Sequence, residues 1–154
     1  MKNNVKIIPF RDAYATEFKN LNIAWLETYF YVETHDREVL ENAKNYIIDK
    51  GGFIFFALFE DKIAGTVALM NEAEGYELSK MAVEPKFQGL KIGQQLMQHC
   101  IDFARAKQWK QLLLYSNTKL ENAIYIYKKY GFVEVALEKE SPYKRSNIKM
   151  VLEL

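Results

Sequence analysis

The chain has 154 residues, 49% of them hydrophobic, and its 21 basic and 20 acidic residues give a formal charge of +1. This length suits one globular domain with a buried core, so we expect residues 1–154 to form a single domain. The near-neutral charge argues against nucleic acid or an anionic membrane surface as the partner. The single cysteine, Cys100, excludes an internal disulfide, and the two histidines give no zinc pattern, so we expect no metal.

The first nine residues hold no apolar stretch of the length that a signal peptide has. The longest apolar run, residues 53–59, is too short to cross a bilayer. These two features predict a soluble, cytoplasmic protein.

The spacing of apolar residues predicts the order of the elements. A strand over residues 5–10 precedes a helix that runs to about Phe30. Asp36 is predicted to be the N-cap of a second helix, which Gly51 and Gly52 end. The remaining prediction is a series of strands at 53–59, 63–70 and 76–83, a helix at 91–107, a strand at 111–115, a helix from Leu120 to Gly131, and strands at 132–137 and 147–154.

The segment 81–93, with the sequence Met-Ala-Val-Glu-Pro-Lys-Phe-Gln-Gly-Leu-Lys-Ile-Gly, leads from a strand through a turn into an amphipathic helix. Backbone N–H groups in such a turn, and in the first turn of the helix after it, lack intrahelical partners and favour negative charge. The segment therefore predicts a site for an anion such as a pyrophosphate. The residues of this cradle are Gln88, Gly89, Leu90, Lys91, Ile92 and Gly93.

The same spacing resembles the acyl-CoA motif of the GCN5-related N-acetyltransferases, Gln/Arg-x-x-Gly-x-Gly/Ala. Gln88 and Gly93 occupy its first and last positions, and Lys91 stands where the family has its middle glycine. A second segment, residues 117–132, resembles the family signature Asn…Ala-Ile-x-x-Tyr-x-Lys-x-Gly-Phe. The order of the predicted elements matches the family over essentially the whole chain.

This resemblance implies the GNAT fold, an α/β (α+β) architecture with a mixed central sheet of about seven strands and about four helices. In that fold the fourth and fifth strands splay apart to admit coenzyme A. The resemblance also implies that acetyl-CoA is the acyl donor and that Met81, Ala82 and Val83 bind it through their backbone. By the same match Asn117 holds the pantetheine arm and Lys129 reaches a phosphate, although a lysine late in a helix also complements the helix dipole.

Two side chains are candidates for the chemistry. Tyr127 matches the family tyrosine that protonates the leaving thiolate, and the alternative is that it only fills the core. Glu77 matches a general base that acts directly or through water. Strand alternation predicts that Glu77 shares a face with Met81 and Val83, and that Lys80 on the other face is a surface charge.

Residues in and after the first predicted helix correspond to the family's acceptor wall. We expect Trp25, Tyr29 and Glu33 to bind the acceptor together with Glu77, because aromatic rings and carboxylates suit a cationic amine. The alternative for the aromatic residues is a role in the core. His35 is a further candidate base, but a lone histidine more often has no such role.

The predicted function is transfer of an acetyl group from acetyl-CoA to a primary amine, with a small molecule as the acceptor. Cys100 lies on the apolar face of its helix, so it is predicted to pack rather than to act as a nucleophile, and the transfer is predicted to be direct. Two alternatives stay open. One is a protein N-terminal or lysine acetyltransferase, and the other is an acyl-CoA-binding module without activity. The resemblance also allows a homodimer.

Overall fold

The computed structural model describes residues 4–139 and 143–154. Its strands are β1 (Val5–Pro9), β2 (Phe53–Phe59), β3 (Lys62–Glu72), β4 (Gly75–Val83), β5 (Gln111–Ser116), β6 (Val133–Val135) and β7 (Ile148–Glu153). Its α-helices are α1 (Ala15–Tyr29), α2 (Thr34–Glu41), α3 (Ile92–Ala106) and α4 (Glu121–Lys129). Short 3-10 helices lie at Asp12–Tyr14 (η1) and Pro85–Phe87 (η3), and a π-helical turn (η2) lies at Lys44–Ile48.

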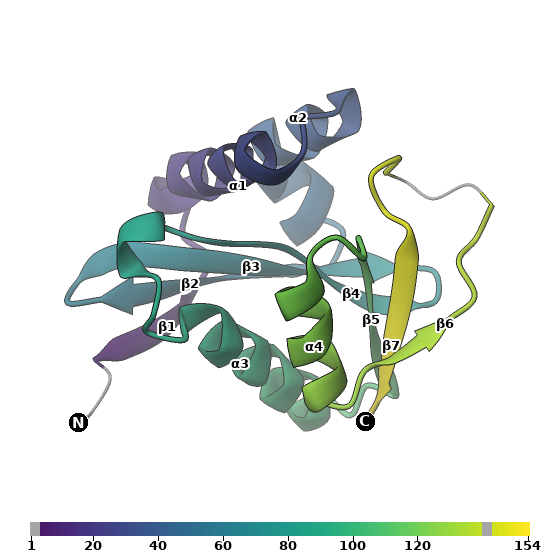
Figure 1. Ribbon diagram of the computed structural model, residues 1–154. Coiled ribbons are helices and arrows are strands. Elements are labelled where there is room, and N and C mark those ends of the chain that lie inside the picture. Colours follow the sequence, from purple (N-terminus) through teal and green to yellow (C-terminus); the bar gives the residue numbers. More distant parts are fainter. Residues whose placement is uncertain (1–3, 140–142) are drawn as a thin grey trace.

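The seven strands form one mixed sheet in the order β1-β2-β3-β4-β5-β7-β6. Strands β4 and β5 pair in parallel, and the other neighbouring strands pair antiparallel. Helices α1 and α2 cover one face of this sheet, while α3 and α4 lie on the other (Figure 1). The predicted fold class, with its mixed seven-stranded sheet and four α-helices, is confirmed.

Two apolar layers hold the helices on the sheet. Phe18, Leu40 and Ile47 pack with Phe56 on the α1–α2 face, and all four are at most 2% exposed. On the other face Cys100 and its neighbours on α3 pack against β3 and β5. Burial raises the pKa of the Cys100 thiol. A buried, un-ionised thiol is a poor nucleophile, which agrees with the predicted packing role.

The start of α2 differs from the prediction. The helix begins at Thr34 with Glu33 as the N-cap, and Asp36 occupies the third helical position instead of the cap. Its Oδ2 atom accepts a hydrogen bond of 2.9 Å from the backbone N–H of Glu33. A carboxylate in the first turn of a helix can accept hydrogen bonds from the free N–H groups, as an N-cap side chain does. The presence of an aspartate therefore does not show by itself whether the helix begins after Asp36 or before it.

The predicted opening between β4 and β5 is present. The two strands pair at Tyr76 with Leu112 and at Glu77 with Leu113, and the register ends there. Beyond that point β4 continues to Val83 and β5 to Ser116. Backbone groups of β4 that would face a neighbour are thereby left available for another partner.

A β-bulge interrupts β4 next to this opening. Ser79 pairs with Ala68 and Ala82 pairs with Thr66, so β4 carries one more residue than β3 between these pairs. Lys80 in the bulge has a φ of 55°, in the left-handed region. Bulges redirect side chains, and this one reverses the sides that regular alternation predicts for the rest of β4.

Two expectations for β4 are therefore wrong. Met81 and Val83 pack with the apolar cluster that contains α3, whereas Glu77 pairs with Met70, which packs with the α1–α2 cluster, so Glu77 lies on the other face. The Lys80 side chain is only 4% exposed, so Lys80 is not a surface charge. A single extra residue accounts for both differences, because the side-chain period of a strand is two.

Candidate functional site

A cavity of about 260 Å³ lies where β4 and β5 separate. Its walls come from α1, β4, β5, α4 and the segment that precedes β7. Because α1 and α4 lie on opposite faces of the sheet, the cavity reaches both faces through the opening (Figure 1). Two ligands could therefore meet there from opposite sides.

The turn before α3 has the features of an anion site. Gly89 has a φ of 90°, and a Cβ atom at this position would have no neighbour within 4 Å. The first hydrogen bond of α3 runs from the Gln95 N–H to the Lys91 carbonyl at 3.0 Å. The N–H groups of Ile92, Gly93 and Gln94 precede it and lack intrahelical partners, which suits a phosphate group.

Lys91 takes the conformation that a glycine would favour. It is the N-cap of α3, its φ is 56° and ψ is 34°, and it is exposed. A left-handed backbone costs a non-glycine residue about 1–2 kcal/mol. The family glycine at this position is thus explained by backbone geometry, and the lysine preserves that geometry.

The other predicted donor-side residues divide into two groups. Gln88, Met81, Ala82 and Val83 line the cavity. Gly89 and Leu90 lie in the turn beside it and Gly93 lies in the first turn of α3, all outside the lining. Lys129 is exposed in the last turn of α4 and does not line the cavity.

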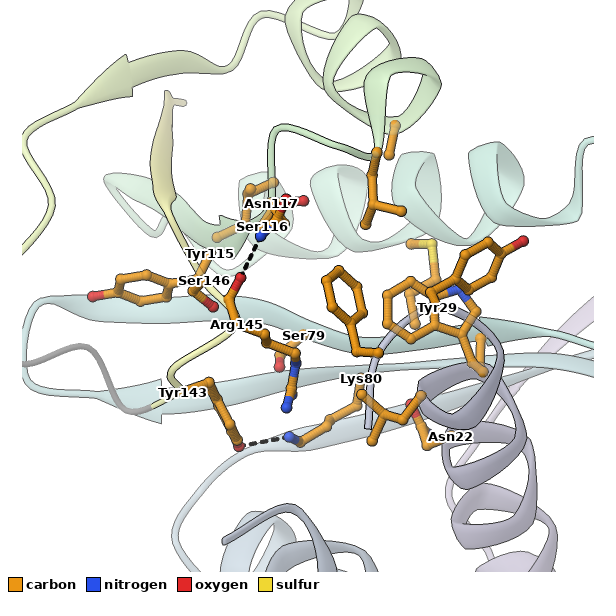
Figure 2. Close-up of a pocket in the computed structure, with 18 of the residues that line it drawn as sticks. Asn22, Tyr29, Ser79, Lys80, Tyr115, Ser116, Asn117, Tyr143, Arg145 and Ser146 are labelled. Carbon is orange, nitrogen blue, oxygen red and sulfur yellow. Dashed lines mark hydrogen bonds between the residues drawn. The ribbon is translucent and has the colours of Figure 1, made fainter. Parts of the chain in front are cut away.

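Asn117 lines the cavity, but its side chain already has partners. Its Nδ2 atom donates to the backbone carbonyl of Arg145 at 2.6 Å (Figure 2), and its Oδ1 atom accepts from the Lys119 N–H at 2.9 Å. The segment before β7 is thereby tied to the end of β5. Binding of another group by the Nδ2 atom would share or replace the bond to Arg145.

Tyr127 on α4 reaches the cavity with a hydroxyl that is available for a ligand. Among the described residues no hydrogen-bond partner lies within reach of this hydroxyl. The ring packs against Phe132, with 6.1 Å between the ring centroids. Burial raises the pKa of the phenol, so in this environment it is a better hydrogen-bond donor than proton donor.

Glu77 contributes a buried carboxyl to the cavity. The residue is 6% exposed. Burial raises its pKa to about 7, while the positive charge of Lys80 opposes this shift. A carboxyl that titrates near neutral pH is suited to accept and release a proton under ordinary conditions.

Four residues form an ion cluster beside Glu77, which we call the Asp36 cluster: Asp36, Lys80, Tyr143 and Arg145. Arg145 holds the fully buried Asp36 with two hydrogen bonds, of 2.6 and 2.7 Å. The Lys80 ammonium lies 3.5 Å from Asp36 Oδ1 and donates to the Tyr143 hydroxyl at 2.6 Å (Figure 2). The cluster joins α2, β4 and the segment before β7 across the cavity wall.

The charges of the Asp36 cluster depend on one another. Burial opposes ionisation of Asp36, yet hydrogen bonds from Arg145 and from the Glu33 backbone, with the Lys80 charge, hold its pKa below the ordinary value. Burial lowers the pKa of Lys80 to about 8, although the Asp36 and Glu77 charges raise it. Removal of one member would leave a buried charge without its partner.

The predicted acceptor wall is present in part. Trp25 and Tyr29 line the cavity, and their ring centroids are 5.2 Å apart. Glu33 does not line it. Its carboxylate lies 3.1 Å from Arg145 Nη1 and accepts from the Lys144 N–H at 3.3 Å. His35 also lies outside the cavity lining, on α2, with its ring 5.4 Å from that of Tyr143.

Sequence reasoning missed Lys80, Tyr143 and Arg145. The bulge that turns Lys80 inward has no marker such as glycine in the sequence around it. Tyr143 and Arg145 come from a segment without regular structure, more than 100 positions after Asp36. A conventional pattern search finds neighbours along the chain, and these contacts are not local.

Among the described residues no group of three or more His, Cys, Asp or Glu side chains is arranged to hold a metal ion. No helix in the same part of the chain has both the length and the apolar character that a membrane span requires.

Comparison with known proteins agrees with this architecture. The family model described as an acetyltransferase (GNAT) domain matches residues 50–134, more than half of the chain. A Dictyostelium discoideum protein named as an uncharacterized N-acetyltransferase is 36% identical over 58 residues, which are 38% of this chain and 27% of that protein. The chain spans less than half the length of the curated relatives it matches.

Solved structures share the fold over almost the full chain. A GNAT-family acetyltransferase from Staphylococcus aureus Mu50 has a TM-score of 0.84 at 23% identity, covering 97% of this chain and 98% of that one. A GNAT-family acetyltransferase from Elizabethkingia anophelis, with acetyl-CoA bound, has a TM-score of 0.73 at 22% identity, covering 99% and 100%.

Proposed function

The chain belongs to the GNAT family of acetyltransferases, and from this premise we propose that it transfers an acetyl group from acetyl-CoA directly to a primary amine. One observation carries the proposal. A buried carboxyl, Glu77, and a hydroxyl without a partner among the described residues, Tyr127, line the same cavity at the opening between β4 and β5. A base and a hydrogen-bond donor at such a place serve transfer better than binding alone.

The chain has suitable groups for coenzyme A. The N–H groups at the start of α3 are free of intrahelical bonds, and open space surrounds Gly89. The backbone of β4 from Met81 to Val83 has no ladder partner on the β5 side. When bound, acetyl-CoA supplies the acetyl thioester. The residues proposed to hold it are those of the predicted cradle, the β4 backbone, Asn117 and Lys129.

Glu77 is the proposed base. An amine that arrives as an ammonium must lose a proton before its nitrogen can form a new bond. The Glu77 carboxylate, which is half-populated near pH 7, can take that proton directly or through a water molecule. The proton then leaves the carboxylic acid for solvent.

Tyr127 is proposed to stabilise the departing thiolate with a hydrogen bond. Its raised pKa makes full proton transfer to a thiolate uphill, since thiols ionise near pH 8.5. A hydrogen bond from the phenol stabilises the developing negative charge without that transfer. Cys100 has no part in this scheme, because it is buried in the apolar layer under α3.

A small amine is the proposed acceptor. The cavity of about 260 Å³ is comparable to the lower end of ordinary small-molecule sites. Trp25 and Tyr29 offer ring faces that attract a cationic amine. The homodimer and the cytoplasmic location stay predictions.

The first test is calorimetric titration with acetyl-CoA and with CoA, followed by an assay for free thiol over pooled amines. We expect binding, and thiol release with at least one pool. Glu77→Gln should bind acetyl-CoA as the wild type does and lose about 10²-fold or more in kcat/KM.

Cys100→Ala is the matched control, because it changes a buried residue that the scheme does not use. Its activity should stay near that of the wild type, and loss of activity would indicate an acyl-enzyme route instead of direct transfer. Binding without release from any pool, a protein acceptor included, would favour the acyl-CoA-binding module. Absence of binding would contradict the proposal.

A further inference from the structure

The Asp36 cluster contains a lysine that the reaction proposed above does not use. Lys80 lies in the β4 bulge, three residues after Glu77, and both side chains line the cavity. Its backbone has a φ of 55°, in the left-handed region that is unfavourable for a lysine. The cluster contacts must offset this cost, so the position of the ammonium is fixed by its partners.

Three contacts restrict the ammonium. It donates to the Tyr143 hydroxyl at 2.6 Å, lies 4.2 Å from the centre of the same ring, and is 3.5 Å from Asp36 Oδ1. Arg145 in turn holds Asp36 through two hydrogen bonds. A lysine side chain, which is flexible on a surface, is here held at one place on the cavity wall.

The charged groups around Glu77 show why the position of the Lys80 ammonium is important for the Glu77 carboxyl. Burial is the main reason that a negative charge on Glu77 is disfavoured, and Glu72 from β3 and Glu138 from the segment after β6 add to it. The Lys80 ammonium opposes them. Asp36 lies 3.5 Å from the Lys80 ammonium and 2.6 Å from Arg145 Nη1, and the Tyr115 hydroxyl on β5 donates a hydrogen bond of 2.8 Å to Glu138.

We infer that Lys80 is a positioning residue for Glu77: held by Asp36 and Tyr143, its ammonium keeps the buried Glu77 carboxylate charged and able to take the proton of the amine. Lys80 itself touches neither the donor nor the acceptor in this role. The inference rests on the proposed function for its consequence in catalysis. The electrostatic effect on Glu77 can be measured without any reaction.

The direct experiment is a pH titration of glutamate carboxyls by NMR, in protein labelled with ¹³C at glutamate and without acetyl-CoA or amine. Glu77→Gln identifies the Glu77 signal. Lys80→Met should move the Glu77 titration upward by about one pH unit, the effect of losing one nearby opposite charge. Lys80→Arg should largely restore the wild-type titration, because the positive charge is kept.

Two further variants complete the set. Tyr143→Phe removes one contact to the ammonium and should move the titration in the same direction by a smaller amount, so it tests the inference even if Lys80→Met does not fold. Lys119→Met is the matched control. Its ammonium contacts the Tyr29 carbonyl and the Phe30 ring, at 2.6 and 4.0 Å, away from Glu77, so the titration should not move.

The kinetic counterpart is the acidic limb of the pH profile of kcat/KM, which should shift with the NMR titration. An unchanged Glu77 titration in the folded Lys80 and Tyr143 variants would overturn the inference while the proposed function could stand. Loss of activity in Lys80→Arg with the titration unmoved would overturn it too, because Lys80 would then be acting as the base. A moved titration without acetyl transfer by the wild type would leave the inference correct and the proposed function wrong.

Discussion

The turn before α3 and the Asp36 cluster are two polar regions on the border of the same cavity, and they are built in opposite ways. The turn takes its shape from consecutive residues, from Gln88 to Gly93, and its polar groups belong to the backbone. The cluster joins side chains from α2, β4 and the segment before β7. The first is set by local geometry, and the second exists only once the whole sheet has formed.

The largest expected effect comes from breaking the cluster. Asp36→Asn removes the charge that holds Arg145 and Lys80 but keeps the size of the side chain. Lys80 would lose its carboxylate partner, while Arg145 would keep Glu33, and the buried ammonium should lower the free energy of unfolding by about 3 kcal/mol or more. Urea denaturation near pH 7 measures this change.

Asp49→Asn is the control for that variant. Asp49 is exposed and lies 3.7 Å from Lys44, so this ion pair should contribute less than about 1 kcal/mol. Equal losses in the two variants would mean that burial of the cluster adds nothing to its strength.

The next effect is a pH-dependent gain in stability at Glu77. Its pKa is raised from 4.5 to about 7 in the folded chain, so the folded state favours the protonated carboxyl. This contribution to the free energy of unfolding is fully present below about pH 4.5 and is lost as the pH rises through 7. Glu77→Gln should therefore raise the free energy of unfolding by about 2 kcal/mol at pH 8 and change it little at pH 4.5.

Urea denaturation at the two pH values compares this variant with the wild type. Glu134→Gln, at an exposed position on β6, is the matched control and should change the free energy of unfolding by less than about 0.5 kcal/mol. A gain at Glu77 that does not depend on pH would indicate a packing effect and no raised pKa.

A smaller effect concerns Tyr127, which lines the cavity that the two regions border. Tyr127→Phe keeps the packing against Phe132 and removes the hydroxyl. If that hydroxyl stabilises the thiolate, kcat should fall about tenfold or more while the affinity for acetyl-CoA stays the same. Thiol release under saturating amine, with calorimetric binding, separates these quantities. Unchanged kcat would assign Tyr127 to packing alone.

The smallest effect is expected in the turn. Lys91→Gly removes the strain of a left-handed backbone at a non-glycine residue, but a glycine also loses more conformational entropy on folding. The net effect should be a rise of about 0.5–1 kcal/mol in the free energy of unfolding. Lys91→Ala keeps the strain and removes only the ammonium. If acetyl-CoA affinity falls in both variants, the ammonium binds the coenzyme, whereas a fall in neither would assign Lys91 to the backbone alone.

The sequence was sufficient where the signals are local. The strand β2 was predicted at its observed bounds, Phe53–Phe59, because its apolar run is uninterrupted. The turn from Gln88 was predicted from a glycine next to an amphipathic helix. Side-chain contacts between distant segments could not be predicted, since the pairing of Arg145 with Asp36 depends on how the segment before β7 crosses the sheet.

The extra residue in β4 also lets one strand supply both sides of the opening. Before the bulge β4 turns Glu77 toward the face covered by α1, and after it Met81 and Val83 face α3. Deleting one residue between Ser79 and Ala82 would restore plain alternation and still leave Glu77 and Val83 on opposite faces, because the pairs of Ser79 with Ala68 and of Ala82 with Thr66 can both be kept. Deletion of Lys80 itself would therefore remove the ion pair between β4 and Asp36 while the sheet kept its strand order.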